Sequence, residues 1–304
     1  MTDIKQVFRL APLTVLLLAC AGQAMALSPQ AILTIDSYDA SGNALNWTEN
    51  VSDLIVVDSS TGNIAMKQGQ VGDTYRNTPT DPDFWAWTAN ANGVGGYWNW
   101  HSAQTTTVTN ADGTTSTPWM TVVNLEKVLG HGDPDLSYGF YAKNNTASTQ
   151  TYSLSIGESI VPVVSGANVV YADFGASLSN PSGSLTIAPV SGYIQQFSLS
   201  SDNGASFVKA GVDVGTAFTT AALGTSTYLA TSPTVNGPLA PSSATPWNFM
   251  QITTKFTLSP NKDVASVSGY ASINPVTPVP EPSSSAMMMA GLGMLGFMAR
   301  RRRT

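Results

Sequence analysis

The chain has 304 residues, one cysteine and a formal charge of −6 at pH 7. Its basic residues are concentrated at the two ends, so residues 27–278 hold seven basic and seventeen acidic residues, a formal charge of −10. This acidic region is not expected to bind nucleic acid or anionic membranes, because both recognise clusters of Lys and Arg. It has no cysteine and therefore no disulfide, but it is long enough to bury an adequate core unaided.

The first 26 residues have the pattern of a secretory signal peptide. Two basic residues precede an apolar run over residues 11–21, and Ala24 and Ala26 then form a small-x-small cleavage site. Cleavage by signal peptidase would leave Leu27 as the mature N-terminus. The alternative is a lipoprotein signal that would lipidate Cys20, because the four residues that end there loosely resemble a lipobox.

Residues 27–273 are predicted to form an all-β ectodomain, an antiparallel β-sandwich. Helix surfaces are normally rich in Glu, Lys and Arg, whereas this region has Thr, Ser and Asn in short alternating runs between turn residues. The clearest strands are expected at 31–35, 54–57, 105–109, 114–123, 137–142, 151–156, 252–258 and 264–273. We expect one domain, and two smaller sandwiches that divide near Pro162 are the alternative.

Three turns are predicted to connect these strands. Asp112-Gly113 should close a hairpin between the third and fourth strands, because this dipeptide readily adopts positive φ. Asn144-Asn145 should close a second hairpin between the fifth and sixth strands. Residues 260–263 should turn the chain into the last strand, which a Pro-containing linker over 274–278 then follows.

Aromatic residues cluster between positions 84 and 101. Trp85 and Trp87 are two positions apart, as are Trp98 and Trp100, so each pair would lie on one face of a strand. If the two strands pair, the four indoles could form one platform for sugar rings. The alternative is that they fill the core, because cross-strand aromatic pairs also stabilise sheets.

Catalytic and metal-binding patterns are weak. The two histidines, His101 and His131, are isolated, and no Gly-x-Ser-x-Gly turn offers a serine nucleophile. Two isolated histidines are too few for a zinc site, so we predict no metal and no cofactor. Asp81-Pro82-Asp83 and Asp133-Pro134-Asp135 are expected to form turns, with weak calcium binding as the alternative. A glycosidase needs only two carboxylates, so composition leaves that class open.

The last 26 residues combine three features in a fixed order. A rigid polar element comes first, followed by an apolar stretch over 283–299 that is close to the minimum length of a membrane-spanning helix. Basic residues end the tail. The polar element is Pro280, Glu281 and Pro282, and the basic residues are Arg300, Arg301, Arg302 and Arg303. Cationic flanks stay in the cytoplasm, so this order predicts a short transmembrane helix with the ectodomain outside.

This tail resembles the PEP-CTERM sorting signal of exosortase substrates, which occur in Gram-negative bacteria that make exopolysaccharide. The resemblance covers residues 279–304. It implies export, transient anchoring in the inner membrane, cleavage near Pro280-Glu281-Pro282, and delivery to the cell surface or extracellular matrix.

A second resemblance lies in the ectodomain. Residues 132–140, Asn144-Asn145-Thr146 and residues 150–154 look like part of one uncharacterised group of PEP-CTERM proteins. The match implies an extracellular β-sandwich and brings no activity with it.

The sequence therefore favours a non-catalytic secreted protein of the cell surface or exopolysaccharide matrix, with signal peptidase and an exosortase as partners during export. One alternative is a carbohydrate-binding module that uses the four tryptophans, which would then be exposed. The other is an extracellular glycoside hydrolase, which needs two carboxylates facing each other in a cleft, about 5–9.5 Å apart.

Overall fold

The computed structural model describes residues 30–276, except 39–43, 59–60, 62, 77–78, 81–82, 102–106, 110–111, 117–120, 132–133, 181–182, 221–223, 233 and 240–245. The predicted signal peptide with its cleavage site, the transmembrane helix over 283–299 and the Arg tail lie outside these residues. In the part that is described, no helix is long and apolar enough to cross a membrane.

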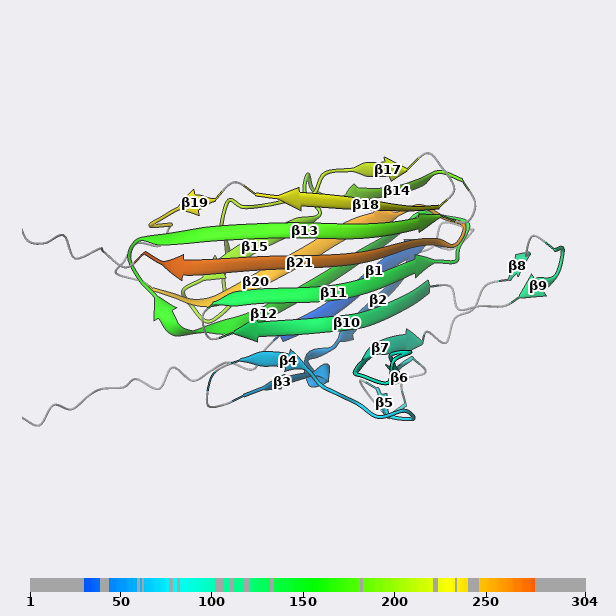
Figure 1. Cartoon of the computed structure of the whole chain (residues 1–304), viewed down its shortest axis with the longest axis horizontal. Coiled ribbons are helices and arrows are strands. Elements are labelled where there is room, and N and C mark those ends of the chain that lie inside the picture. The colour runs from blue at the N-terminus through cyan, green and yellow to red at the C-terminus, as the bar shows by residue number, and fades with distance from the viewer. Residues whose placement is uncertain are drawn as a thin grey trace, which may run out of the picture.

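Two antiparallel sheets pack face to face (Figure 1). The small sheet contains β1 (Gln30–Tyr38), β2 (Ala44–Asn50), β12 (Gln150–Val164), β14 (Leu185–Pro189), β15 (Gln195–Ser200), β16 (Val208–Lys209), β17 (Phe218–Thr220) and β20 (Trp247–Leu258). Its main strand order is β16-β15-β20-β12-β1-β2, and β14 joins β17 to β20.

The large sheet lies in front in Figure 1, and the strands of the small sheet cross diagonally behind it. It contains β3 (Ile55–Val57), β4 (Ile64–Met66), β5 (Thr74–Tyr75), β6 (Phe84–Ala89), β7 (Gly96–His101), β10 (Thr121–His131), β11 (Asp135–Asn144), β13 (Asn168–Asn180), β18 (Gly224–Thr231), β19 (Val235–Asn236) and β21 (Asp263–Pro275). Its main order is β18-β13-β21-β11-β10-β7-β6-β5. A 3-10 turn, η1 (Ser52–Leu54), precedes β3.

The described strands therefore form the predicted all-β antiparallel sandwich. Each sheet is continuous across both halves of the chain, which meet in one strand pair per sheet: β12 pairs with β20 along most of its length, and β11 pairs with β21. Pro162 lies within β12. The alternative of two sandwiches that divide near Pro162 is wrong, because the pairing crosses that position in both sheets.

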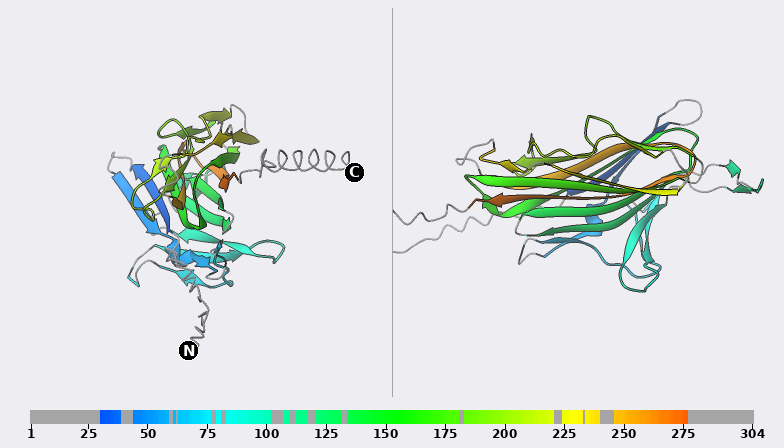
Figure 2. Two further views of the ribbon diagram at one scale, coloured as in Figure 1. Left: turned by 90° about the vertical axis from the view of Figure 1, so that its left-hand side faces the viewer. Right: turned by 45° about the horizontal axis from the view of Figure 1, so that its top comes forward.

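The predicted hairpin at Asp112-Gly113 is confirmed. β8 (Val108–Thr109) pairs with β9 (Thr115–Ser116), and Gly113 has the positive φ that the turn requires, +80°. This small hairpin projects from one end of the sandwich, as the second view in Figure 2 shows.

The predicted hairpin at Asn144-Asn145 is wrong. β11 belongs to the large sheet and β12 to the small sheet, so this connection crosses between the sheets instead of pairing its two strands. The turn at 260–263 crosses in the same way from β20 to β21. The two crossings lie side by side, because the Lys262 amide donates to the Asn144 carbonyl at 2.7 Å.

The side chain of Asn144 holds both crossings in place. Its amide nitrogen donates to the carbonyl oxygens of Ser148, Leu258 and Ser259 at 2.8, 3.1 and 3.0 Å. Its carbonyl oxygen accepts from the Thr146 backbone amide and hydroxyl at 2.9 and 2.7 Å. A fully satisfied buried amide of this kind stabilises both crossings.

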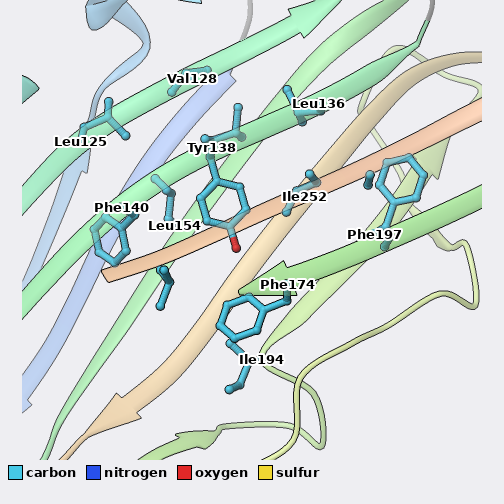
Figure 3. Close-up of a cluster of buried hydrophobic side chains, with 14 of the residues drawn as sticks. Leu125, Val128, Leu136, Tyr138, Phe140, Leu154, Phe174, Ile194, Phe197 and Ile252 are labelled. Carbon is cyan, nitrogen blue, oxygen red and sulfur yellow. The ribbon is translucent and has the colours of Figure 1, made fainter. Parts of the chain in front are cut away.

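Alternating residues of both sheets fill the core (Figure 3). Tyr138 of β11 reaches across it, and its hydroxyl donates to Oε1 of Gln195 at 3.0 Å. Gly269 makes this contact sterically feasible, because a Cβ there would lie 1.8 Å from that oxygen. Burial of each large apolar side chain contributes roughly 1.5–3 kcal/mol.

Candidate functional site

The four tryptophans are on paired strands but face the core. Trp85 lies opposite Trp100 and Trp87 opposite Trp98, so the pairing inferred from their spacing is present. Their exposed fractions, however, are only 1, 0, 6 and 3% in that order. An exposed indole platform for sugars is therefore wrong, and the core-packing alternative fits the burial.

The surroundings of Trp87 and Trp98 explain this burial. Gly69 and Gly96 make room for the Trp87 indole, because a Cβ on either would come within 2.9 Å of that side chain. The Trp98 indole nitrogen donates to the Lys67 carbonyl at 2.9 Å. The outward face of the same strands carries other aromatic groups: His101 stacks on Phe84 with ring centroids 4.8 Å apart.

The outer face of the large sheet instead carries a groove of about 610 Å³, which we call the outer groove. Small residues form its floor: Gly139 lies opposite Ser268 on the neighbouring strand, and Ser137 lies two positions before Gly139. Tyr270 and Asp173 form one wall, on β21 and β13. Its volume is within the usual range for a ligand site.

The opposite wall comes from β10 and depends on a break in strand register. Leu125 pairs with Phe140, but the next paired residue is Lys127, so Glu126 is the extra residue of a β-bulge. Both Glu126 and Lys127 consequently point outward, whereas strict alternation would turn one of them into the core. Leu129 and His131 continue this wall toward the end of the strand.

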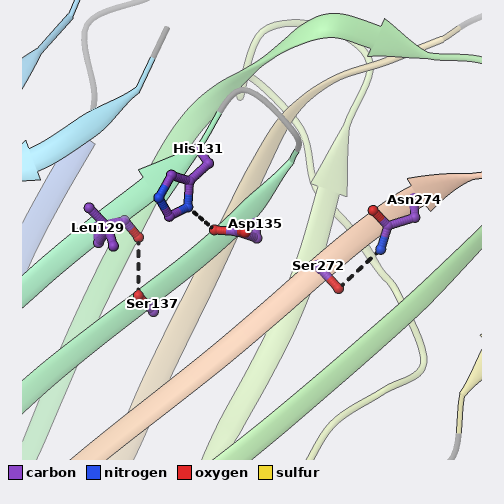
Figure 4. Close-up of polar contacts among 6 residues, drawn as sticks. All are labelled: Leu129, His131, Asp135, Ser137, Ser272 and Asn274. Carbon is purple, nitrogen blue, oxygen red and sulfur yellow. Dashed lines mark hydrogen bonds and ion pairs between the residues drawn. The ribbon is translucent and has the colours of Figure 1, made fainter. Parts of the chain in front are cut away.

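Hydrogen bonds fix the end of the outer groove at the β10–β11 turn (Figure 4). Nδ1 of His131 lies 2.7 Å from Oδ1 of Asp135, and the Ser137 hydroxyl donates to the Leu129 carbonyl at 3.3 Å. The second histidine considered in the sequence, His101, lies elsewhere, and burial lowers its pKa.

A smaller hollow of about 340 Å³ adjoins the groove, and we call it the side hollow. Asn90, Gly96, Tyr97 and Glu126 line it, so Glu126 borders both spaces. Tyr141 lies opposite Asn124, two positions before Glu126. Burial, and then the charges of Glu126 and Tyr97, raise the pKa of Tyr141.

Two carboxylates of the groove are partly desolvated. Burial raises the pKa of Glu126, against a hydrogen bond from Ser266 that lowers it. Burial also raises the pKa of Asp173, against the hydrogen bond from the Tyr171 hydroxyl. The Tyr171 ring lies 6.2 Å from that of Tyr270, so two tyrosines adjoin this wall.

Sequence reasoning missed these groove residues, although one signal was visible. The apolar positions of β10 alternate from Val123 to Leu125 and then skip to Val128, a spacing of three that indicates a bulge. The tyrosines of the groove could not be identified from the sequence, because alternate residues of any strand in a sheet point outward. Among the described residues, no group of three or more potential ligands could hold a metal. Asp81, Pro82 and Asp133 of the two Asp-Pro-Asp turns lie outside them.

Comparison with solved structures gives weak likenesses. A TmCBM61 structure in complex with beta-1,4-galactotriose has a TM-score of 0.21 and 9% identity, over 45% of this chain and 71% of that chain. A structure of infectious bursal disease virus Gx strain has a TM-score of 0.28 and 14% identity, over 80% and 55% of the two chains. A structure of carbohydrate-binding modules from the beta-sandwich superfamily has a TM-score of 0.21 and 10% identity, over 77% and 82%. At these scores the likenesses support no ligand or activity for this chain.

Comparison of sequences is informative only at the C-terminus. No curated protein matches the chain, and the resemblance of its ectodomain to one group of PEP-CTERM proteins stays a prediction. Residues 278–303 match the family described as the PEP-CTERM protein-sorting motif. The chain therefore carries a PEP-CTERM sorting motif, which indicates an exported protein that is anchored transiently in the membrane and processed by an exosortase.

Proposed function

We propose that the processed protein is a non-catalytic component of the cell surface or exopolysaccharide matrix, and that it binds glycan chains in the outer groove. The observation that carries this proposal is the groove itself, in which Tyr270 borders a floor of Gly139, Ser137 and Ser268. The Tyr171 ring lies next to Tyr270, with the ring centroids 6.2 Å apart. Aromatic faces pack against the apolar faces of sugar rings, and the hydroxyl and carboxylate groups can bond to sugar hydroxyls.

The shape of the site also supports a polymer as the ligand. The outer groove is open along the sheet surface, and Glu126 lines both this groove and the side hollow. A secreted protein with an exosortase signal meets exopolysaccharide in the envelope, and an open groove accepts an internal segment of a chain without needing its end.

Glycan binding can be tested with the full chain purified in detergent. Neutral cello-, chito- and galacto-oligosaccharides are titrated by calorimetry against wild type, Tyr270→Ala and Tyr193→Ala. Tyr193 is the matched control, because it is an exposed tyrosine outside the groove, 44% accessible. We expect binding of at least one oligosaccharide that weakens about tenfold or more in Tyr270→Ala, since a stacking face is lost. Equal affinity in both variants, or shortened oligosaccharide products, would refute the proposal.

A further inference from the structure

We infer that Glu126 makes the outer groove selective for glycans with free amino groups, by binding one such group where the groove meets the side hollow. This inference rests on the proposed function. It adds that the ligand is positively charged and that Glu126 is the residue that recognises this charge. The β-bulge of β10 is what brings the Glu126 side chain to this junction.

The position of Glu126 suits a bound ammonium group. Its carboxylate borders both spaces, so a sugar in either one has a substituent within its reach. Tyr97 lines the side hollow together with Glu126, and an aromatic ring near a carboxylate also attracts cations. A hydrogen bond from Ser266 lowers the pKa of this carboxylate against the larger effect of burial, and a carboxylate has further acceptor positions for a ligand.

The charges around the groove favour the same ligand. Its lining has three carboxylates, Glu126, Asp135 and Asp173, against one lysine, Lys127, and His131. His131 is already paired with Asp135. Within the described ranges, neither Glu126 nor Asp173 has a basic side chain within ion-pair distance, and both are partly desolvated. A cationic sugar would supply the missing charge, whereas a uronic-acid polymer would be repelled.

The test compares three probes on the full chain by calorimetry at pH 6. They are a β-1,4-linked glucosamine tetramer, its fully N-acetylated counterpart and a mannuronate tetramer. We expect the glucosamine tetramer to bind about tenfold more tightly than the acetylated one, because a charge-assisted hydrogen bond replaces a neutral contact. Mannuronate should bind most weakly, and added salt should reduce the preference.

Two variants assign the selectivity. Glu126→Gln keeps the side-chain shape and should lower the glucosamine affinity to that of the acetylated tetramer, whose own affinity stays unchanged. Asp112→Asn is the matched control, because it removes an exposed carboxylate from the projecting β8–β9 hairpin, outside the groove, and Asn-Gly keeps the turn chemistry. It should leave the preference for glucosamine unchanged. Retained preference in Glu126→Gln would overturn the role of this residue.

Failure of the inference differs from failure of the proposed function. Equal affinity of wild type for the two chito-oligosaccharides, with loss of both in Tyr270→Ala, would overturn the charge selectivity and leave glycan binding intact. If none of the neutral or charged oligosaccharides binds wild type, the proposed function fails and this inference fails with it.

Discussion

Single residues decide how much space the outer groove offers, and Gly139 is the clearest case. A Cβ at this position would lie 3.4 Å from Cβ of Lys127, an ordinary contact, so the backbone tolerates a side chain here. Gly139→Val should therefore fill the floor and weaken oligosaccharide binding about tenfold or more, measured by calorimetry. Its melting temperature should stay close to that of wild type.

Gly130 provides the contrasting variant. Its Cβ would lie 2.0 Å from Oε2 of Glu158, inside the sandwich, so Gly130→Ala should lower the melting temperature through a clash in the core. A large loss of stability in Gly139→Val, or none in Gly130→Ala, would contradict this assignment of the two glycines.

Glu158 predicts an unusual dependence of stability on pH. It is 1% exposed, and neither carboxylate oxygen has a hydrogen-bond partner. Burial, and then the charge of Asp135, raise its pKa to about 9 from an ordinary 4.5. Between these values the unfolded chain releases the proton and the folded chain retains it, so stability falls as pH rises through this window. The slope is about 1.4 kcal/mol per pH unit from this one group.

Glu158→Gln should remove that slope, because the amide stays neutral in both states. Urea unfolding of wild type and variant at pH 5, 7 and 9 measures it. We expect similar free energies of unfolding at pH 5 and a variant that is more stable by a few kcal/mol at pH 9. A wild-type stability that is flat over this range would contradict the buried, protonated state of Glu158.

The pairing and burial of individual side chains could be predicted from the sequence only in part. The spacing of Trp85, Trp87, Trp98 and Trp100 predicted their cross-strand pairing correctly. It could not predict which face is buried, because Phe84, Tyr97 and His101 make the opposite face aromatic as well. Contacts with residues that are distant in the sequence determine which face is buried. One of them is the hydrogen bond from the Trp98 indole nitrogen to the Lys67 carbonyl.

Among the secondary-structure elements, the two crossings between the sheets depend on Asn144. Asn144→Ala removes the partners of three carbonyl oxygens and of the Thr146 amide and hydroxyl. We expect a loss of about 2–4 kcal/mol in the free energy of unfolding, since buried groups are left unsatisfied. Urea unfolding checks this, with Thr149→Ala at an exposed position of the same connection as control. A variant as stable as wild type would show that other bonds hold the crossings.

The strands could be predicted from local sequence patterns, but the way in which they are connected could not. Alternation located the strands on both sides of Asn144-Asn145, and the turn residues located the connection. A hairpin and a crossing between sheets, however, have the same local signature of turn residues between alternating strands. The hydrogen bonds from Asn144 to the carbonyl oxygens of Leu258 and Ser259, more than a hundred positions away, distinguish the crossing from a hairpin. Local sequence patterns contain no information on such distant contacts.

For the whole molecule, the sorting motif follows closely on the folded part. β21 runs through the middle of the large sheet and ends at Pro275, three residues before the motif begins.

Replacing Pro280, Glu281 and Pro282 by alanine should block processing, so the full-length tail stays in the inner membrane. Replacing the four arginines by serine should instead weaken retention at the membrane, because basic flanks set orientation. Fractionation with mass spectrometry measures both, and a mature form that still contains residues 287–303 would contradict exosortase processing.

The most direct test of the account is an oligosaccharide titration of the full chain followed by nuclear magnetic resonance. If glycans bind in the outer groove, the backbone amide signals of Gly139, Ser268 and Tyr270 shift with increasing neutral oligosaccharide. The indole N–H signals of Trp85, Trp87, Trp98 and Trp100 should stay in place, because these side chains are buried. Indole signals that move while the groove amides stay unchanged, or no change at saturating oligosaccharide, would contradict glycan binding in the outer groove.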